Sequence, residues 1–107
     1  MILSELLEVI EPIEVIGSTE KEIKGLHFDS RKIGPGDLFV AQVGTAVDGH
    51  TFIDGCVAKG AAAIVLSKRE YLSPTQPPHG GEEISPTYIL VENTDKALGL
   101  LASKWFG

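Results

Sequence analysis

Two short polar segments carry the residues whose types and spacing could do chemistry. The first is Asp29-Ser30-Arg31, which follows an extended stretch over 23–28. Ligands of open α/β sheets sit beyond the carboxyl ends of strands, so a serine hydroxyl at this place could hydrogen-bond to a bound polar group. The alternative interpretation is a turn begun by Asp29 and Ser30, with Arg31 solvated. Spacing alone favours the turn.

The second segment is the loop 44–50, Gly-Thr-Ala-Val-Asp-Gly-His, which leads into a helix predicted to begin at Thr51. Free backbone N–H groups in a glycine-flanked loop and at a helix start can hold a phosphate or a ring rich in carbonyls. In the alternative interpretation this is an ordinary connection, Asp48 forms a turn and His50 lies on the surface. Two such segments after adjacent strands favour a shared ligand groove.

The remaining reactive side chains favour structural roles. Cys56 lies on the apolar side of a predicted helix, so we expect core packing. We expect His27 to be structural, His79 to be exposed and Trp105 to lie in the core. The histidines share no metal-ligand spacing, and the sequence has no phosphate loop, Gly-x-Gly-x-x-Gly or nucleophile elbow. Taken alone, these residues favour a binding module over a catalyst.

Charge and composition limit the partners. The 107 residues carry 9 Lys and Arg against 15 Asp and Glu, a net charge of −6, which argues against a nucleic-acid partner. A single cysteine excludes a disulfide framework and a cysteine-based zinc site. No apolar run approaches the ~20 residues of a membrane span, and the acidic start is unlike a signal peptide. We therefore expect a cytoplasmic protein with no membrane partner and no bound metal.

The elements that must position these segments follow from hydrophobic periodicity and turn residues. A short amphipathic helix begins at Leu3, Gly34-Pro35-Gly36 forms a type II turn, and Thr51 with Asp54 resembles a capping box. Phe52 is placed on the buried side of the helix that follows, and Gly60 ends that helix in the left-handed region. The pattern predicts further strands at 13–16, 38–41, 62–66 and 88–91, helices at 51–59 and 94–105, and an exposed loop at 68–86.

This alternation of strands and helices predicts one α/β domain over 1–107. We expect a small mixed, largely parallel sheet of about four to five strands flanked by helices.

An ordered string of motifs resembles the N-terminal, UDP-binding domain of the Mur ligases. These are the ATP-dependent enzymes that add amino acids to the peptidoglycan precursor. The resemblance covers most of the chain except the proline-rich loop. It is carried by Asp29-Ser30-Arg31-Lys32, the run from Gly34 to Ala41, Gly44 with the run from Asp48 to Ile53, Lys59-Gly60-Ala61, and the closing strand and helix from Val91 to Gly107.

In that family the N-terminal domain anchors the UDP end of a UDP-sugar-peptide, the central domain binds ATP, and the C-terminal domain binds the incoming amino acid. The resemblance therefore implies that 1–107 is the first domain of a three-domain ligase. It implies ATP and Mg²⁺ for the full-length enzyme and none for this fragment, which should be inactive alone. The implied partners are the UDP-N-acetylmuramoyl-dipeptide substrate and the central domain of the same protein.

The resemblance also implies the site residues. Ser30 takes the position of a polar contact to the nucleotide, and Phe28 lies where the family lines the uridine site. Thr45, Ala46 and Val47 take the loop positions that approach the UDP moiety. Some relatives carry polar side chains where Ala46 stands, so only backbone groups or Thr45 could make those contacts here.

Within the family the loop and the N-terminal helix are most similar to the third-step ligases, which act on UDP-N-acetylmuramoyl-L-alanyl-D-glutamate. Thr45 stands where an acidic residue is usual, which favours this subgroup. The fourth-step ligases share the Asp-Ser/Thr-Arg and Asp-Gly-His elements and remain an alternative. A stand-alone binding module that keeps the fold without the ligand is another.

Overall fold

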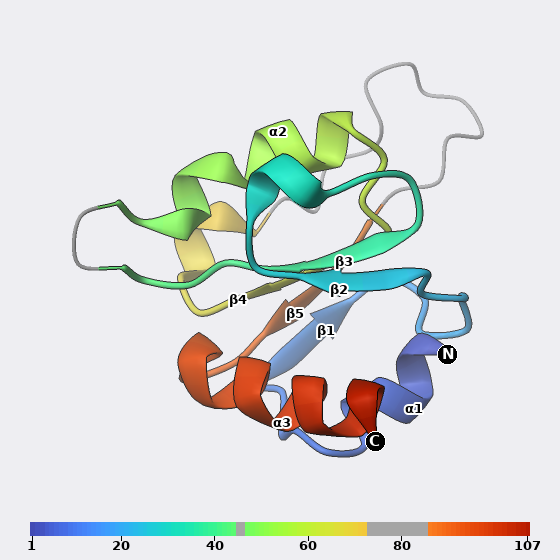
Figure 1. Cartoon of the computed structure of the whole chain (residues 1–107). Helices are drawn as coiled ribbons and strands as arrows, with labels where there is room; N and C mark the ends of the chain where they lie inside the picture. Colours follow the sequence, from blue (N-terminus) through green and yellow to red (C-terminus); the bar gives the residue numbers. More distant parts are fainter. Residues whose placement is uncertain (45–46, 73–85) are drawn as a thin grey trace.

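The computed structural model describes residues 1–44, 47–72 and 86–107, and in them five strands form one sheet (Figure 1). The strand order across the sheet is β1-β5-β4-β3-β2. The four strands β2 to β5 run parallel to one another, and β1 pairs antiparallel with β5. The predicted mixed, largely parallel sheet is therefore confirmed. The strands are β1 (Glu14–Ile16), β2 (Gly25–His27), β3 (Asp37–Val40), β4 (Ala63–Leu66) and β5 (Thr87–Leu90).

Helices cover both faces of the sheet. Figure 1 shows α1 (Leu3–Leu7) and α3 (Thr94–Phe106) on one face and α2 (Ile53–Ala58) on the other. Every residue of β4 and β5 is buried, as expected for strands with both faces covered. Side chains along β3 alternate between the layers, because successive residues of a strand point to opposite faces.

Two apolar cores result, one under each helical layer. The α3-side core takes Leu38 and Val40 of β3, and the α2-side core takes Phe39. Cys56 is fully buried in the α2-side core, as predicted, and Trp105 packs, partly buried, against the α3-side core. The α3-side core also holds Leu3, Leu6, Ile10, Ile89 and Leu101, and the α2-side core Ile33, Ile53, Ile64, Leu66 and Leu90.

The helix predicted at 51–59 begins differently. The chain first makes the 3₁₀ turn η2 (Gly49–Phe52) and only then enters α2. The capping box at Thr51 and Asp54 is wrong: the Asp48 side chain caps the turn by accepting the N–H of His50. Thr51 instead donates its hydroxyl to the Asp48 carbonyl oxygen at 2.8 Å. An upstream aspartate in extended conformation suits this role better than a threonine already inside the turn.

The segment after β4 opens with the 3₁₀ turn η3 (Arg69–Tyr71). Tyr71 and Leu72 are half-buried and pack against the α2-side core. Residues 73–85 of the predicted loop 68–86, which include His79, lie outside the described residues.

Two glycines with positive φ hold the turn before β3 against the end of α2. Gly36 has φ +86°, and Asp37 donates its N–H to the Gly34 carbonyl, so the predicted type II turn is confirmed. Gly60 has φ +96° and accepts the N–H of Gly36 at 3.0 Å. A Cβ added to Gly60 would lie 3.1 Å from Cα of Pro35. This position therefore requires glycine.

Replacing Gly60 with alanine should lower the free energy of unfolding by about 1–3 kcal/mol, because the left-handed backbone strains any side chain there. Gly99 is the matched control: it lies inside α3, and a Cβ there would meet nothing within 4 Å. Gly99→Ala should raise the free energy of unfolding by about 0.5–1 kcal/mol. Urea unfolding followed by circular dichroism measures both, and equal signs would contradict this account.

Candidate functional site

A groove of about 400 Å³ lies beyond the carboxyl ends of β2 and β3. One wall is the segment after β2 that contains the 3₁₀ turn η1 (Ser30–Lys32), and the other wall is the loop after β3. The two polar segments singled out in the sequence therefore border one hollow. The groove is lined by Phe28, Asp29, Ser30, Arg31, Phe39, Gln42, Gly44, Val47, Gly49 and Phe52.

The first wall is shaped by Asp29, which caps η1. Its carboxylate accepts the backbone N–H of Arg31 at 3.0 Å and also holds the guanidinium, through Nε at 3.0 Å and Nη2 at 2.9 Å. These bonds to Arg31 lower the pKa of Asp29 to about 2. The backbone carbonyl of Ser30 accepts from Nζ of Lys59 at 2.8 Å. The Ser30 segment is therefore fixed on both sides, with Arg31 at the rim.

The second wall is a loop closed at its base by backbone contacts. Gly49 donates its N–H to the Gln42 carbonyl at 2.7 Å, and Val43 forms an antiparallel bridge with Asp48. A Cβ on Gly49 would lie 2.7 Å from that same carbonyl oxygen, so a larger residue would force the base of the loop open. This close approach explains the glycine before His50.

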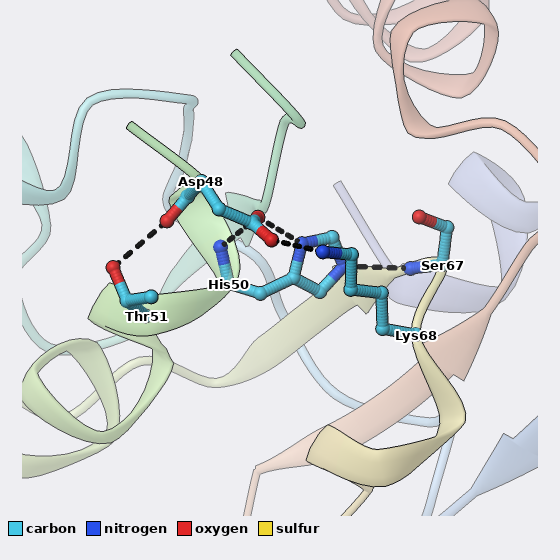
Figure 2. Close-up of polar contacts among 5 residues, drawn as sticks. All are labelled: Asp48, His50, Thr51, Ser67 and Lys68. Carbon is cyan, nitrogen blue, oxygen red and sulfur yellow. Dashed lines mark hydrogen bonds and ion pairs between the residues drawn. The ribbon is translucent and has the colours of Figure 1, made fainter. Parts of the chain in front are cut away.

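A buried histidine ties the loop to the next strand, as Figure 2 shows. The His50 side chain is fully buried, which contradicts the surface position of the alternative interpretation. Its Nδ1 lies 2.8 Å from Asp48 Oδ1, and its Nε2 accepts the N–H of Ser67 at 2.9 Å. A backbone N–H can only donate, so Nε2 must be unprotonated and Nδ1 carries the proton. The Asp48 Oδ2 pairs with Nζ of Lys68.

Exposed apolar side chains border the groove. Phe28 is 59% exposed, Val47 56% and Phe52 44%. The sequence placed Phe52 on the buried side of a helix, and this is wrong because the 3₁₀ turn rotates it away from the positions of Ile53 and Cys56. Large exposed apolar residues gathered at one hollow are typical of a binding surface.

The structure brings three of the five predicted site residues, Phe28, Ser30 and Val47, into this groove. Thr45 and Ala46 lie outside the described residues. Sequence reasoning missed Gln42 and Phe52. Gln42 could have been found, since it lies two residues after the carboxyl end of β3, where ligands of open sheets bind.

His27, expected to be structural, places Nε2 3.6 Å from the Asp37 carboxylate and stands outside the groove lining.

A second hollow of about 300 Å³ lies between the end of α1 and the start of α3. It contains none of the predicted site residues. Among the described residues, no group of three or more His, Cys, Asp or Glu side chains could hold a metal ion. Nor does any helix in the described ranges reach the length and apolarity needed to cross a membrane.

Comparison with known protein families identifies the family of the chain. The family model described as "Mur ligase family, catalytic domain" matches residues 22–106, which include both walls of the groove. The chain belongs to the Mur ligase family.

Named Mur ligases match the whole chain in sequence, and a solved Mur ligase structure matches most of it. UDP-N-acetylmuramoyl-L-alanyl-D-glutamate–2,6-diaminopimelate ligases are 38% identical in Bacteroides thetaiotaomicron and 39% in Phocaeicola vulgatus, each over 107 residues. A crystal structure of MurF from Acinetobacter baumannii aligns with a TM-score of 0.68 at 25% identity and covers 94% of this chain. The chain spans 20% of the length of each of these relatives.

The low pKa of Asp29 should be measurable by carboxylate NMR titration. Removing the guanidinium with Arg31→Ala should raise the pKa of Asp29 from about 2 toward its ordinary 3.8. Because the folded-state pKa is depressed, the ionised carboxylate favours folding above about pH 4, and this contribution is lost as the pH falls toward 2. Arg69→Ala, which removes a pair with Glu14, is the control and should leave Asp29 unchanged. A wild-type value near 3.8 would contradict the geometry.

The His50 tautomer is open to direct measurement. Long-range ¹H–¹⁵N NMR at neutral pH should show a protonated Nδ1 and an unprotonated Nε2, because Ser67 occupies the Nε2 lone pair. Ser67→Pro would remove that N–H, and the Nδ1–H tautomer should persist because the Asp48 carboxylate still accepts from Nδ1 at 2.8 Å. A protonated Nε2 in the wild-type chain would exclude the bond drawn in Figure 2.

Proposed function

We propose that this chain is the part of a peptidoglycan ligase that binds the UDP end of UDP-N-acetylmuramoyl-L-alanyl-D-glutamate. The single observation that carries the proposal is the groove itself. It combines Phe28, Ser30 and Val47, three positions that the family pattern assigns to the nucleotide, in a chain that belongs to the family.

The groove suits a uridine diphosphate chemically. The exposed rings of Phe28 and Phe52 offer apolar faces to a planar base, and base–aromatic stacking contributes about 1–3 kcal/mol per base. The Ser30 hydroxyl and the Gln42 amide oxygen are polar groups of the kind that pair with uracil, while Nε2 of Gln42 donates to Asp95 Oδ1 at 2.8 Å. Arg31 is 87% exposed at the rim, and its guanidinium, paired on one side with Asp29, is the groove-lining cation that a phosphate could approach.

Holding the UDP end would contribute to the reaction of the whole ligase by positioning. A handle bound far from the reacting carboxylate lowers the entropic cost of assembling the reactants and supplies remote binding energy. The described residues hold no group of three or more His, Cys, Asp or Glu side chains that could bind the Mg²⁺ that accompanies ATP in the full-length enzyme. In this proposal the central domain of the same cytoplasmic enzyme binds both, so 1–107 is a substrate-anchoring domain without activity of its own.

The third-step reaction is favoured over the fourth. The relatives named for ligation of diaminopimelate to UDP-N-acetylmuramoyl-L-alanyl-D-glutamate are 38–39% identical to the chain over its full length. The MurF structure shares the fold at 25% identity. We therefore propose a third-step ligase.

The test is binding of nucleotides to the 107-residue chain by isothermal titration calorimetry and ligand-observed NMR. UDP and UDP-N-acetylmuramoyl-L-alanyl-D-glutamate should bind, and ADP should bind at least about tenfold more weakly, since the groove contacts the base. Phe28→Ala should weaken UDP binding about tenfold through lost stacking. Ser30→Ala should weaken it about fivefold through a lost hydrogen bond.

Phe106→Ala is the matched control, because Phe106 is 78% exposed on α3, away from the groove. It should bind UDP as the wild type does. Equal affinity for UDP and ADP, or no binding of the full UDP-sugar-peptide at millimolar concentration, would overturn the proposal.

A further inference from the structure

The loop wall of the groove has two separate attachments to the sheet. The first is the backbone contact at its base, from Gly49 to Gln42 at the end of β3. The second runs through side chains to the end of the neighbouring strand β4, and Asp48 is at its centre (Figure 2). The loop is therefore fixed relative to two strands, although it follows only one of them.

The second attachment consists of two parallel links from the same carboxylate. Oδ1 of Asp48 accepts from the His50 ring, whose Nε2 in turn accepts the N–H of Ser67, the residue after β4. Oδ2 pairs with Nζ of Lys68, the next residue along. His50 is fully buried and its ring centroid lies 5.4 Å from that of Tyr71, so this imidazole has little room to move.

Helix capping alone does not account for this arrangement. A cap of η2 needs one oxygen, the one that accepts the His50 backbone N–H at 2.9 Å, and asparagine would provide it equally well. The second oxygen is used on Lys68, which belongs to a different element. The surrounding donors also hold the pKa of Asp48 well below its ordinary range, Lys68 contributing most, so the carboxylate is charged at neutral pH.

We propose that Asp48 is a positioning residue for the nucleotide groove: by pairing with Lys68 and His50 it holds the Gly44 and Val47 wall at the distance from Ser30 that the ligand requires. The proposal rests on the proposed function, because it names how that same groove is kept in shape. Asp48 is absent from the groove lining and acts through the loop.

The experiment is a double-mutant cycle on UDP affinity in the 107-residue chain. Asp48→Asn keeps the cap and the bond to the ring but loses the ion pair, and Lys68→Met loses the same pair from the other side. Each should raise the Kd for UDP about three- to tenfold, and the double variant should be no weaker than either single variant within about twofold. Lys104→Met, on α3, is the matched lysine control and should leave Kd unchanged.

If Asp48 and Lys68 only stabilised the fold, their variants should behave like a variant that weakens the core far from the groove. Ile89→Val in the α3-side core should lower stability without touching the groove, and it should leave the Kd for UDP unchanged at a temperature well below unfolding. Hydrogen exchange at the Gly49 amide, which bonds to Gln42, reports the loop directly. It should speed up at least threefold in Asp48→Asn and Lys68→Met and stay unchanged in Ile89→Val.

The outcomes separate the two proposals. If the wild-type chain binds UDP and both variants bind it equally well, or if their losses simply add in the double variant, the positioning role is overturned and the proposed function stands. If the wild-type chain does not bind UDP, the proposed function fails, and unchanged Gly49 exchange in the two variants would overturn the loop attachment as well.

Discussion

Burial of two adjacent strands on both faces is the constraint on which the rest of the structure depends. Every residue of β4 and β5 is buried, so helices must cover both sides of the sheet and the connections must cross over rather than turn back as hairpins. Strands β2 to β5 therefore run parallel, and their carboxyl ends meet at one edge. The groove lies at that edge because the polar segments that follow β2 and β3 are brought together there.

Much of this fold could be predicted from periodicity. The apolar runs 38–41 and 62–66 predict buried strands, and the parallel sheet follows from the alternation of strands and helices. Turn chemistry was equally local: Gly34, Pro35 and Gly36 predict the turn that the structure contains. The predictions succeeded where the information lies within a few neighbouring residues.

The errors share a different cause. The periodicity of the predicted helix places Phe52 on the buried side, and the alternative interpretation of the loop places His50 on the surface; the structure contradicts both positions. The buried His50 ring bonds to Ser67, which is 17 residues further along the chain. It also bonds to Asp48, and Asp48 in turn pairs with Lys68, which is 20 residues beyond Asp48. No periodicity in one segment reports such partners. The shared groove was predicted from two polar segments that follow adjacent strands, whereas the choice of Phe28 and Val47 as its ligand-facing residues came from the family pattern.

The residues of the groove contribute little to the free energy of folding, but they determine the shape of the groove. A partly exposed ion pair such as Asp48–Lys68 contributes only about 0–1 kcal/mol to folding, far less than the core residues under α2 and α3. Phe28 and Phe52 leave apolar surface in water and so contribute little to the core. These residues therefore matter little to whether the sheet forms. What they determine is the spacing and chemistry of two walls, and a ligand that must touch both walls at once is sensitive to that spacing even when the fold is not.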